Sequence, residues 1–443
     1  MTTSAVTRTA PAAVDTTSPL PGPRSASEVT AVGPARKELP GWPLTVALFG
    51  LPVFWMLGVL PFIYVGVALV MVVLMVFRRG TELIPGLLPW FAFLVWTLAS
   101  SVMVTGTGQA IGYLMRVADL VAVGVIMVYY VNARERVTPR LVMGGLVSMW
   151  LTTVGLGLLA IAFPDTRITT PVGLLMPEGL TSNTLVSELV FPRLAEVQQP
   201  GGVEEPYNRP AAPFPYANSW GVAYVLLTPV VIAFIGMAHR RLTKVLLVIA
   251  LPLSVWPALE TSNRGMFLGL AVVLLAMVGR LALRGRFRPA LATMLATAAG
   301  AYALVASGAA AEILGRQEYS DSTSTRANVY GATIRATLES PLLGWANPQN
   351  DATIGIAIGT QGYVWTLMFC FGFVGLGLFL VFLLGGIART AGVVSTTGLW
   401  LHAVLLSSAV IIFFYGLGGT QLLVVCLCLA VLLRARRFHE EVG

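Results

Sequence analysis

Four arginines are candidates for binding an anion: Arg116, Arg264, Arg326 and Arg335. The guanidinium group offers a planar fork of N–H donors that fits the oxygens of a phosphate or a carboxylate. Carboxylates lie close to these arginines in the sequence, and a positioned carboxylate can take a proton from a reacting hydroxyl. These residue types predict the binding of a phosphate or diphosphate group together with proton transfer.

Arg264 ends the segment Glu260-Thr-Ser-Asn-Arg264, which separates two apolar stretches. In the predicted topology this segment faces outward, where arginine is less common than on the cytoplasmic side. Two interpretations are open. Arg264 could bind an anionic lipid headgroup or a diphosphate, with Glu260 as a neighbouring base, or it could pair with Glu260 at the membrane surface. Ser262 lies in Thr-Ser-Asn-Arg-Gly rather than in Gly-x-Ser-x-Gly, so serine hydrolysis has no support.

Arg116 and Asp119 lie three residues apart in another apolar stretch. Ionisable side chains are costly inside a membrane span and tend to face the interior of the bundle. At this spacing the two side chains can form an ion pair. Either they form a buried structural pair, or Arg116 binds a substrate phosphate and Asp119 orients it.

The composition places these residues in a membrane protein. Of the 443 residues, 56% are hydrophobic and 11% are charged, whereas a soluble domain has about 25% charged residues. A helix needs about 20 apolar residues to cross the hydrocarbon core, and on that basis about twelve spans are predicted. They are 43–58, 60–77, 85–104, 109–131, 140–163, 217–237, 244–259, 265–281, 289–309, 362–387, 398–415 and 419–433.

The basic residues follow the positive-inside rule. With the N-terminus inside, every predicted cytoplasmic junction carries arginine, from Arg78 to the run at 434–437. The net charge of +8 is therefore spread along the cytoplasmic face of a plasma membrane. It does not form the clustered patch of a nucleic-acid-binding surface. Both termini are predicted to be cytoplasmic, and no nucleic acid is expected as a partner.

The chain divides into three parts. Residues 1–40 are rich in Thr, Ser, Ala and Pro, which predicts a disordered cytoplasmic tail. Residues 41–435 form an all-α, polytopic bundle, and 436–443 form a second cytoplasmic tail. Two long loops, 164–216 and 310–361, face outward on the same side. Long loops in compact proteins are often functional, so a shared outward-facing site is predicted.

The second loop contains a predicted helix. Residues 324–338 place apolar side chains at a spacing of three to four residues. Arg326 falls in the first turn, and Arg335 lies nine residues later, so the two side chains leave opposite faces. Pro341 and Gly344 end the helix and turn the chain.

The cysteines and histidines predict neither a metal centre nor a disulfide framework. The three cysteines lie in apolar runs and the three histidines are far apart in the chain, which does not match the spacing of metal ligands. No cofactor and no metal are expected. His402 lies in a predicted span and is interpreted as a hydrogen-bonded group of the bundle.

Three segments carry a family resemblance: PFPYANSWG (213–221), LETSNRGMFLGL (259–270) and STSTRANVYGATIRATLESPLLGW (322–345). In order, spacing and topology they resemble the O-antigen ligase and polysaccharide polymerase (Wzy-like) superfamily of bacterial inner-membrane glycosyltransferases. The resemblance covers about residues 43–435. It implies a metal-independent, inverting transfer of a glycan from undecaprenyl diphosphate to a glycan or lipid acceptor on the outward face.

The resemblance also implies roles for residues. Arg264 and Arg326 match the arginines of the family that are thought to bind the donor diphosphate. Arg116 and Arg335 are further candidates for that role. The supporting residues are Asp119, Asn218 and Ser262.

One departure from the family bears on the activity. Ligases of this family carry a histidine in the second outward loop, where this chain reads GTQGYVW with Gln361 and has no histidine in the loop. This favours a polymerase, or a transferase with a carboxylate base. The candidate bases are Glu260, Glu318, Asp321 and Asp351, and Glu260 is preferred because it lies close to Arg264 in the sequence. Other polysaccharide-assembly proteins could be partners.

Two alternatives belong to other classes. A flippase for lipid-linked oligosaccharide, or another secondary transporter, would also bury charges such as Arg116 and Asp119. Transporters commonly show internal repeats. The two halves of this chain show no convincing repeat, and its charges gather near the outward face. The second alternative is a non-catalytic membrane scaffold for polysaccharide assembly.

Overall fold

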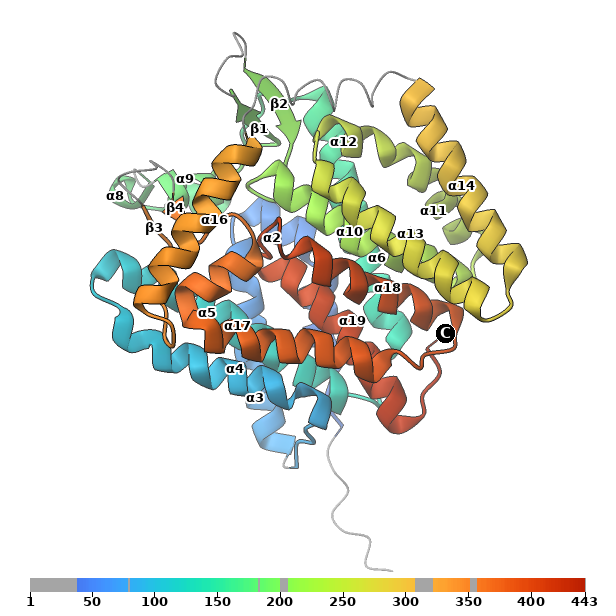
Figure 1. Cartoon of the computed structure of the whole chain (residues 1–443), viewed down its shortest axis with the longest axis horizontal. Coiled ribbons are helices and arrows are strands. Elements are labelled where there is room, and N and C mark those ends of the chain that lie inside the picture. Colours follow the sequence, from blue (N-terminus) through green and yellow to red (C-terminus); the bar gives the residue numbers. More distant parts are fainter. Residues whose placement is uncertain are drawn as a thin grey trace, which may run out of the picture. The chain divides into compact units, whose positions relative to one another are not determined.

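The computed structural model describes residues 38–442, apart from Arg79 and the segments 182–183, 200–205, 307–321 and 351–356. The described chain is a bundle of helices (Figure 1). Nine helical segments in this part of the chain are long and apolar enough to cross a membrane. The predicted helical membrane bundle is therefore confirmed, whereas the count of about twelve spans stays a prediction. Residues 1–37 of the predicted tail lie outside the described residues.

The nine segments include two that are built from shorter helices. One joins η1 (Pro85–Leu87), α4 (Leu88–Ala99) and η2 (Ser100–Met103), and the other joins α11 (Arg241–Leu253) and α12 (Val255–Glu260). The remaining seven are α3 (Leu60–Arg78), α5 (Thr107–Asn132), α6 (Pro139–Ala162), α10 (Ala217–Met237), α13 (Arg264–Leu283), α17 (Tyr363–Thr390) and α19 (Gly419–Phe438).

The other predicted spans are helical but do not belong to the nine. They are α1 (Trp42–Phe49) with α2 (Leu51–Leu57), α14 (Phe287–Ala306) and α18 (Thr396–Ile411). The first of these is divided at Gly50, with Pro52 at the start of the second helix. Since proline lacks an N–H, it begins a helix more readily than it continues one. The helix α18 has 16 residues and is shorter than the usual span.

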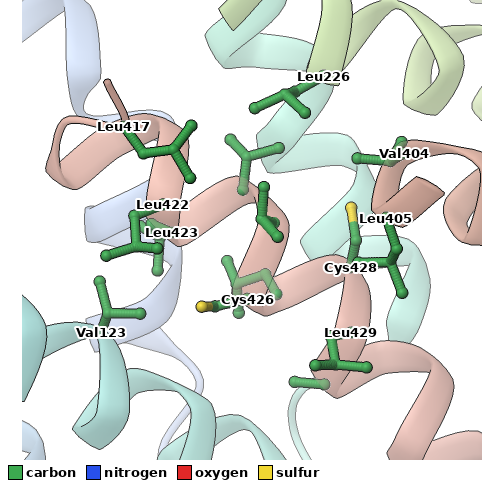
Figure 2. Packing of buried hydrophobic residues seen from close by; sticks show 14 of the residues in the cluster. Val123, Leu226, Val404, Leu405, Leu417, Leu422, Leu423, Cys426, Cys428 and Leu429 are labelled. Atoms are coloured by element: carbon green, nitrogen blue, oxygen red, sulfur yellow. The ribbon is translucent and has the colours of Figure 1, made fainter. Parts of the chain in front are cut away.

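Helix α19 lies at the centre of the bundle. In its apolar window 83% of the residues are buried inside the protein. Figure 2 shows its Cys426 and Cys428 among Val123 of α5, Leu226 of α10 and Val404 of α18. The cysteines are free and buried, in keeping with their interpretation as core residues. Inside a membrane such a core is held by close van der Waals packing, because lipid tails are as apolar as leucine.

The predicted all-α class omits two small hairpins. In the first loop, β1 (Ala195–Gln198) pairs antiparallel with β2 (Tyr207–Pro210), and the register places Glu196 opposite Arg209. In the second loop, β3 (Gln349–Asn350) pairs with β4 (Ala357–Ile358). The first loop also forms the short helices α7 (Pro171–Leu175), α8 (Glu178–Thr181) and α9 (Thr184–Val190).

The helix predicted in the second loop is present as α16 (Ser322–Glu339). The chain then turns at residues 341–346, and this turn packs against α17. Helix α17 is interrupted at Gly372, whose φ of 69° and ψ of −175° are not helical. An interruption leaves backbone groups without helical partners, which is tolerated at membrane depth only where protein or water supplies partners.

The 341–346 turn supplies those partners. The backbone N–H groups of Trp345 and Ala346 donate to the carbonyl oxygens of Phe369 and Cys370 at 2.8 and 2.9 Å. In the other direction, the N–H of Phe373 donates to the Pro341 carbonyl oxygen at 2.8 Å.

The helix α4 contributes to the same contact. The indole Nε1 of Trp96 donates to the carbonyl oxygens of Leu342 and Phe371, both at 3.1 Å. The turn is tied to α16 as well, since the Trp345 indole donates to the Ala336 carbonyl oxygen at 2.8 Å. The broken helix, the turn, α4 and α16 therefore form one hydrogen-bonded unit.

Replacing Gly372 by alanine is expected to destabilise this unit. The backbone of Gly372 lies in a region that residues with a Cβ avoid, and a Cβ there would lie 2.2 Å from the Leu342 carbonyl oxygen. We expect Gly372→Ala to cost about 2 kcal/mol or more. The measurement is the midpoint of thermal unfolding of the purified protein in detergent.

Gly377 provides the matched control on the same helix. A Cβ on Gly377 would meet no atom within 4 Å. Because alanine favours a helix over glycine by about 1 kcal/mol, Gly377→Ala is expected to keep or raise the midpoint. If the two variants unfold at the same temperature, the interruption of α17 does not constrain the fold.

Candidate functional site

The start of α13 lies beside the start of α17, where the second loop ends. Tyr415, which follows α18, joins the two with hydrogen bonds. Its hydroxyl accepts from the N–H of Gly265 at the start of α13, and its carbonyl oxygen accepts from the N–H of Tyr363 at the start of α17, both at 3.0 Å. The side that carries the loops is called the loop side below, and Figure 1 shows β1, β2, α12 and one end of α16 near the top of the view.

Arg209 on β2 connects the first loop to the turn between α12 and α13. The side chain is only 6% exposed. Its Nε donates to the Thr261 carbonyl oxygen at 2.7 Å, and its terminal nitrogens donate to Asn218 Oδ1 at 3.2 Å and to Gln198 Oε1. The place where these segments meet, formed by Arg209, Asn218 and residues 260–264, is called the loop-side junction.

The sequence alone did not single out Arg209. It is one of several charged residues in the first loop. Its neighbours in the sequence form no recognisable functional motif, although Pro210 and an aromatic segment follow it. Its partners lie in three separate segments of the chain, so its importance depends on the tertiary structure.

The turn between α12 and α13 has a defined geometry. Ser262 has a φ of +50°, a left-handed conformation that is uncommon outside glycine. Asn263 caps α13, because its Oδ1 accepts from the N–H of Met266 at 3.2 Å. Its Nδ2 donates to the Asn218 carbonyl oxygen at 3.4 Å. The structure therefore brings two predicted supporting residues, Asn218 and Ser262, to the junction with Arg264.

Arg264 is the first residue of α13 and is half-buried. It makes no hydrogen bond or ion pair with any residue that the structure describes. Glu260 is exposed and does not pair with it, so the interpretation of Arg264 as one half of a surface ion pair finds no support among the described residues. The guanidinium group also stands at a helix N-terminus, where the aligned peptide dipoles favour an anion.

Arg116 has a structural set of partners. It donates to Asn347 Oδ1 at 2.6 Å and to the Ala346 carbonyl oxygen at 3.5 Å. Asn347 in turn donates to the Gln109 carbonyl oxygen at 2.9 Å. Arg116 thus fastens the end of the 341–346 turn to α5. The described residues show no ion pair between Arg116 and Asp119, whose carboxylate lines a cavity.

The remaining site residues of the second loop are only partly described. The backbone of Arg326 belongs to α16, whereas its side chain and all of Asp351 lie outside the described residues. Arg335 is exposed on α16. The helix is held near the start of α17, because the ring of Tyr330 stacks on Trp365 with centroids 4.2 Å apart. The roles of Arg326 and Arg335 in binding a diphosphate stay predictions.

A cavity of about 800 Å³ opens near the loop-side junction. Its walls come from α3, α5, the start of α19 and the first loop, and its carboxylates are Asp119, Glu188 and Glu196. Glu196 accepts from the N–H of Ala217 at 2.7 Å at the start of α10. Burial, and then the negative charges of Glu188 and Glu196, raise the pKa of the Tyr216 phenol at this cavity.

His402 lies in α18, within the bundle. The predicted role of His402 is confirmed, since the side chain is buried and its Nε2 is hydrogen-bonded to the Ile387 carbonyl oxygen at 3.0 Å. In the described part of the chain, no group of three or more His, Cys, Asp or Glu side chains could hold a metal ion.

Comparison of the chain with protein-family models, with curated proteins and with solved structures gives no match. The class defined by the fold is a helical membrane bundle with a loop-side junction and an adjacent cavity.

Replacing Arg209 by methionine is expected to loosen the loop-side junction. The substitution would leave the Thr261 carbonyl oxygen, on a fully buried residue, without its donor at 2.7 Å. A buried polar group without a partner costs about 1–3 kcal/mol. We therefore expect a lower midpoint of thermal unfolding and faster proteolysis of the first loop.

Arg167 provides the control for this prediction. It donates to the Phe191 carbonyl oxygen at 2.9 Å and to Ser187 Oγ at 2.7 Å, but it is exposed. Water can replace it, so Arg167→Met is expected to cost less than about 1 kcal/mol. A loss of stability in Arg167→Met equal to that in Arg209→Met would show that burial of Arg209 is not the cause.

Proposed function

We propose that this protein is a membrane glycosyltransferase of the O-antigen ligase and polysaccharide polymerase type, acting on a glycan delivered on undecaprenyl diphosphate. The observation that carries the proposal is Arg264, a half-buried arginine without a partner among the described residues. It stands at a helix N-terminus on the loop side, where a lipid diphosphate at the membrane surface would meet it. Its position supports the role that the family resemblance implies.

The reaction needs an acid–base group and a cation, but no metal. The acceptor hydroxyl oxygen attacks the anomeric carbon and forms the new glycosidic bond. The bond between that carbon and the diphosphate oxygen breaks, and its electron pair leaves with the diphosphate. Arg264, assisted by Arg326, would stabilise the developing negative charge. A carboxylate takes the proton of the acceptor hydroxyl.

The base is proposed among carboxylates of the loop side. Glu260 precedes Arg264 by four residues, is exposed and makes no ion pair within the described chain, which leaves its carboxylate accessible. Asp351 is the second candidate for the general base, because it belongs to the second loop. Because the loop lacks a histidine at the position used by ligases, polymerisation is preferred over ligation. The proposed location is a bacterial plasma membrane with both termini cytoplasmic.

The interruption of α17 is the one observation that favours the alternative, a transporter of lipid-linked oligosaccharide. Transporters often bind their substrate at unwound segments of broken helices. Here the freed groups are already paired, since Trp345, Ala346 and Trp96 donate to the carbonyl oxygens of Phe369, Cys370 and Phe371. The interruption therefore serves packing, which leaves glycosyl transfer as the better-supported function.

Arg264→Ala is expected to abolish the product of the reaction. The test is analysis of cell-envelope glycans in a deletion strain that carries the wild type, Arg264→Ala or Arg264→Lys at equal expression. Loss of one stabilising donor at a developing negative charge lowers a rate by about 10²–10³-fold. Lysine keeps the charge but loses the fork of donors, so Arg264→Lys is expected to restore part of the product.

Arg241 is the matched control, because it is the exposed first residue of α11, at the opposite end of the bundle. Arg241→Ala is expected to restore wild-type glycan. Single lipid-linked repeat units in the deletion strain would support a polymerase, and long chains left on the lipid carrier would support a ligase. Full-length glycan attached normally in Arg264→Ala would refute the proposal and favour transport.

A further inference from the structure

Asp119 is a carboxylate without a partner near the middle of the span α5 (Thr107–Asn132). It lies in the wall of the 800 Å³ cavity and makes no hydrogen bond or ion pair with the residues that the structure describes. Gly419 at the start of α19 lies directly beside it, because a Cβ on Gly419 would lie 3.3 Å from the Asp119 Oδ2. A carboxylate at this depth is costly unless something donates hydrogen bonds to it.

The rest of the wall combines aromatic rings with neutral polar groups. The rings belong to Trp55, Phe62, Tyr64, Phe214 and Tyr216. The neutral polar side chains include Thr420 and Gln421 at the start of α19. The hydroxyl groups of Tyr64 and Thr420 are hydrogen-bonded to each other at 3.2 Å. Small-molecule sites have this character, with mostly apolar walls, a few placed polar groups and a volume of about 300–1,000 Å³.

The charges of the cavity disfavour a diphosphate as its occupant. Its described lining has the carboxylates of Asp119, Glu188 and Glu196 and one arginine, Arg193. An anion would be repelled from such a surface. An isoprenoid chain would fit the apolar walls but has no donor for Asp119. A sugar meets both requirements, since its hydroxyl groups can donate to a carboxylate and its C–H faces can pack against aromatic rings.

We propose that this cavity binds the sugar portion of the substrate and that Asp119 accepts a hydrogen bond from a sugar hydroxyl. The identity of the sugar as substrate rests on the proposed function, but the binding itself does not require catalysis. The diphosphate end is held at the loop-side junction by Arg264, outside the cavity. The positive charge of Arg264 thus binds the diphosphate, and the negative charge of Asp119 binds the sugar. The sugar can belong to the same lipid-linked saccharide or to the acceptor.

The test is binding of a lipid-free saccharide to the full-length protein in lipid nanodiscs, measured by isothermal titration calorimetry. The probe is the oligosaccharide released by mild acid from the polyprenyl-diphosphate lipids of the source cells. The wild type is expected to bind it saturably. Asp119→Leu, which suits a membrane span, is expected to bind at least about tenfold more weakly, the effect of one hydrogen bond to a charged group.

Two further variants separate a direct effect from misfolding. Ala118 also lines the cavity, and Ala118→Phe is expected to weaken binding by filling it. Glu178 is an exposed carboxylate of the first loop that does not line the cavity, so Glu178→Gln is expected to bind as the wild type does. Size-exclusion chromatography and the unfolding midpoint verify that each variant is folded.

The outcomes for the two proposals can be told apart. The cavity is not a sugar site if the wild type shows no saturable binding, or if both cavity variants bind with wild-type affinity. This conclusion holds even where Arg264→Ala abolishes the glycan product. If Arg264→Ala keeps its product while Asp119→Leu loses binding, the sugar site stands and the proposed reaction falls. Wild-type saccharide binding by Arg264→Ala supports the assignment of the sugar to the cavity.

Discussion

The interruption of α17 at Gly372 is the constraint on which the position of the second loop depends. Inside a membrane, an unpaired backbone carbonyl costs several kcal/mol, so the interruption requires donors from elsewhere. The 341–346 turn provides them through Trp345 and Ala346, and α4 adds the indole of Trp96. The same turn is anchored to α5 by Arg116 through Asn347. Because the Trp345 indole also donates to the Ala336 carbonyl oxygen, these bonds fasten the C-terminal part of α16 to the bundle.

The arginines of the loop side divide into two groups by their hydrogen bonds. Arg116 and Arg209 are engaged with carbonyl and amide oxygens of segments that they hold together. Arg264 has no such partner in the described chain and lies at the start of α13. Since a structural arginine already has its donors satisfied, Arg264 is better able than Arg116 or Arg209 to bind an anionic substrate group. This difference connects the geometry of the junction to the proposed transfer reaction.

The loop side also separates positive and negative charge. The junction offers Arg264, whereas the cavity offers Asp119, Glu188 and Glu196 beside five aromatic rings. A lipid-linked saccharide has a matching division, with a doubly charged diphosphate next to neutral sugar rings. Electrostatic complementarity of this kind fixes the direction in which a substrate binds more than it adds affinity. The first loop links the two regions, because β1 contributes Glu196 to the cavity and β2 contributes Arg209 to the junction.

The sequence by itself determined the helical membrane class, the helices that carry the long apolar runs and the α16 helix. These features follow from the length of apolar runs and from the spacing of apolar residues, both of which are local in the chain. The tertiary structure decided which charged side chains are free. It engaged Arg116 with Asn347, left Glu260 unpaired with Arg264, exposed Asp119 to a cavity and revealed Arg209 as a buried connection. The reason is physical: the partner of Arg116 lies 231 residues away and one partner of Arg209 lies 52 residues away. Partners so far away in the chain cannot be predicted from the local sequence.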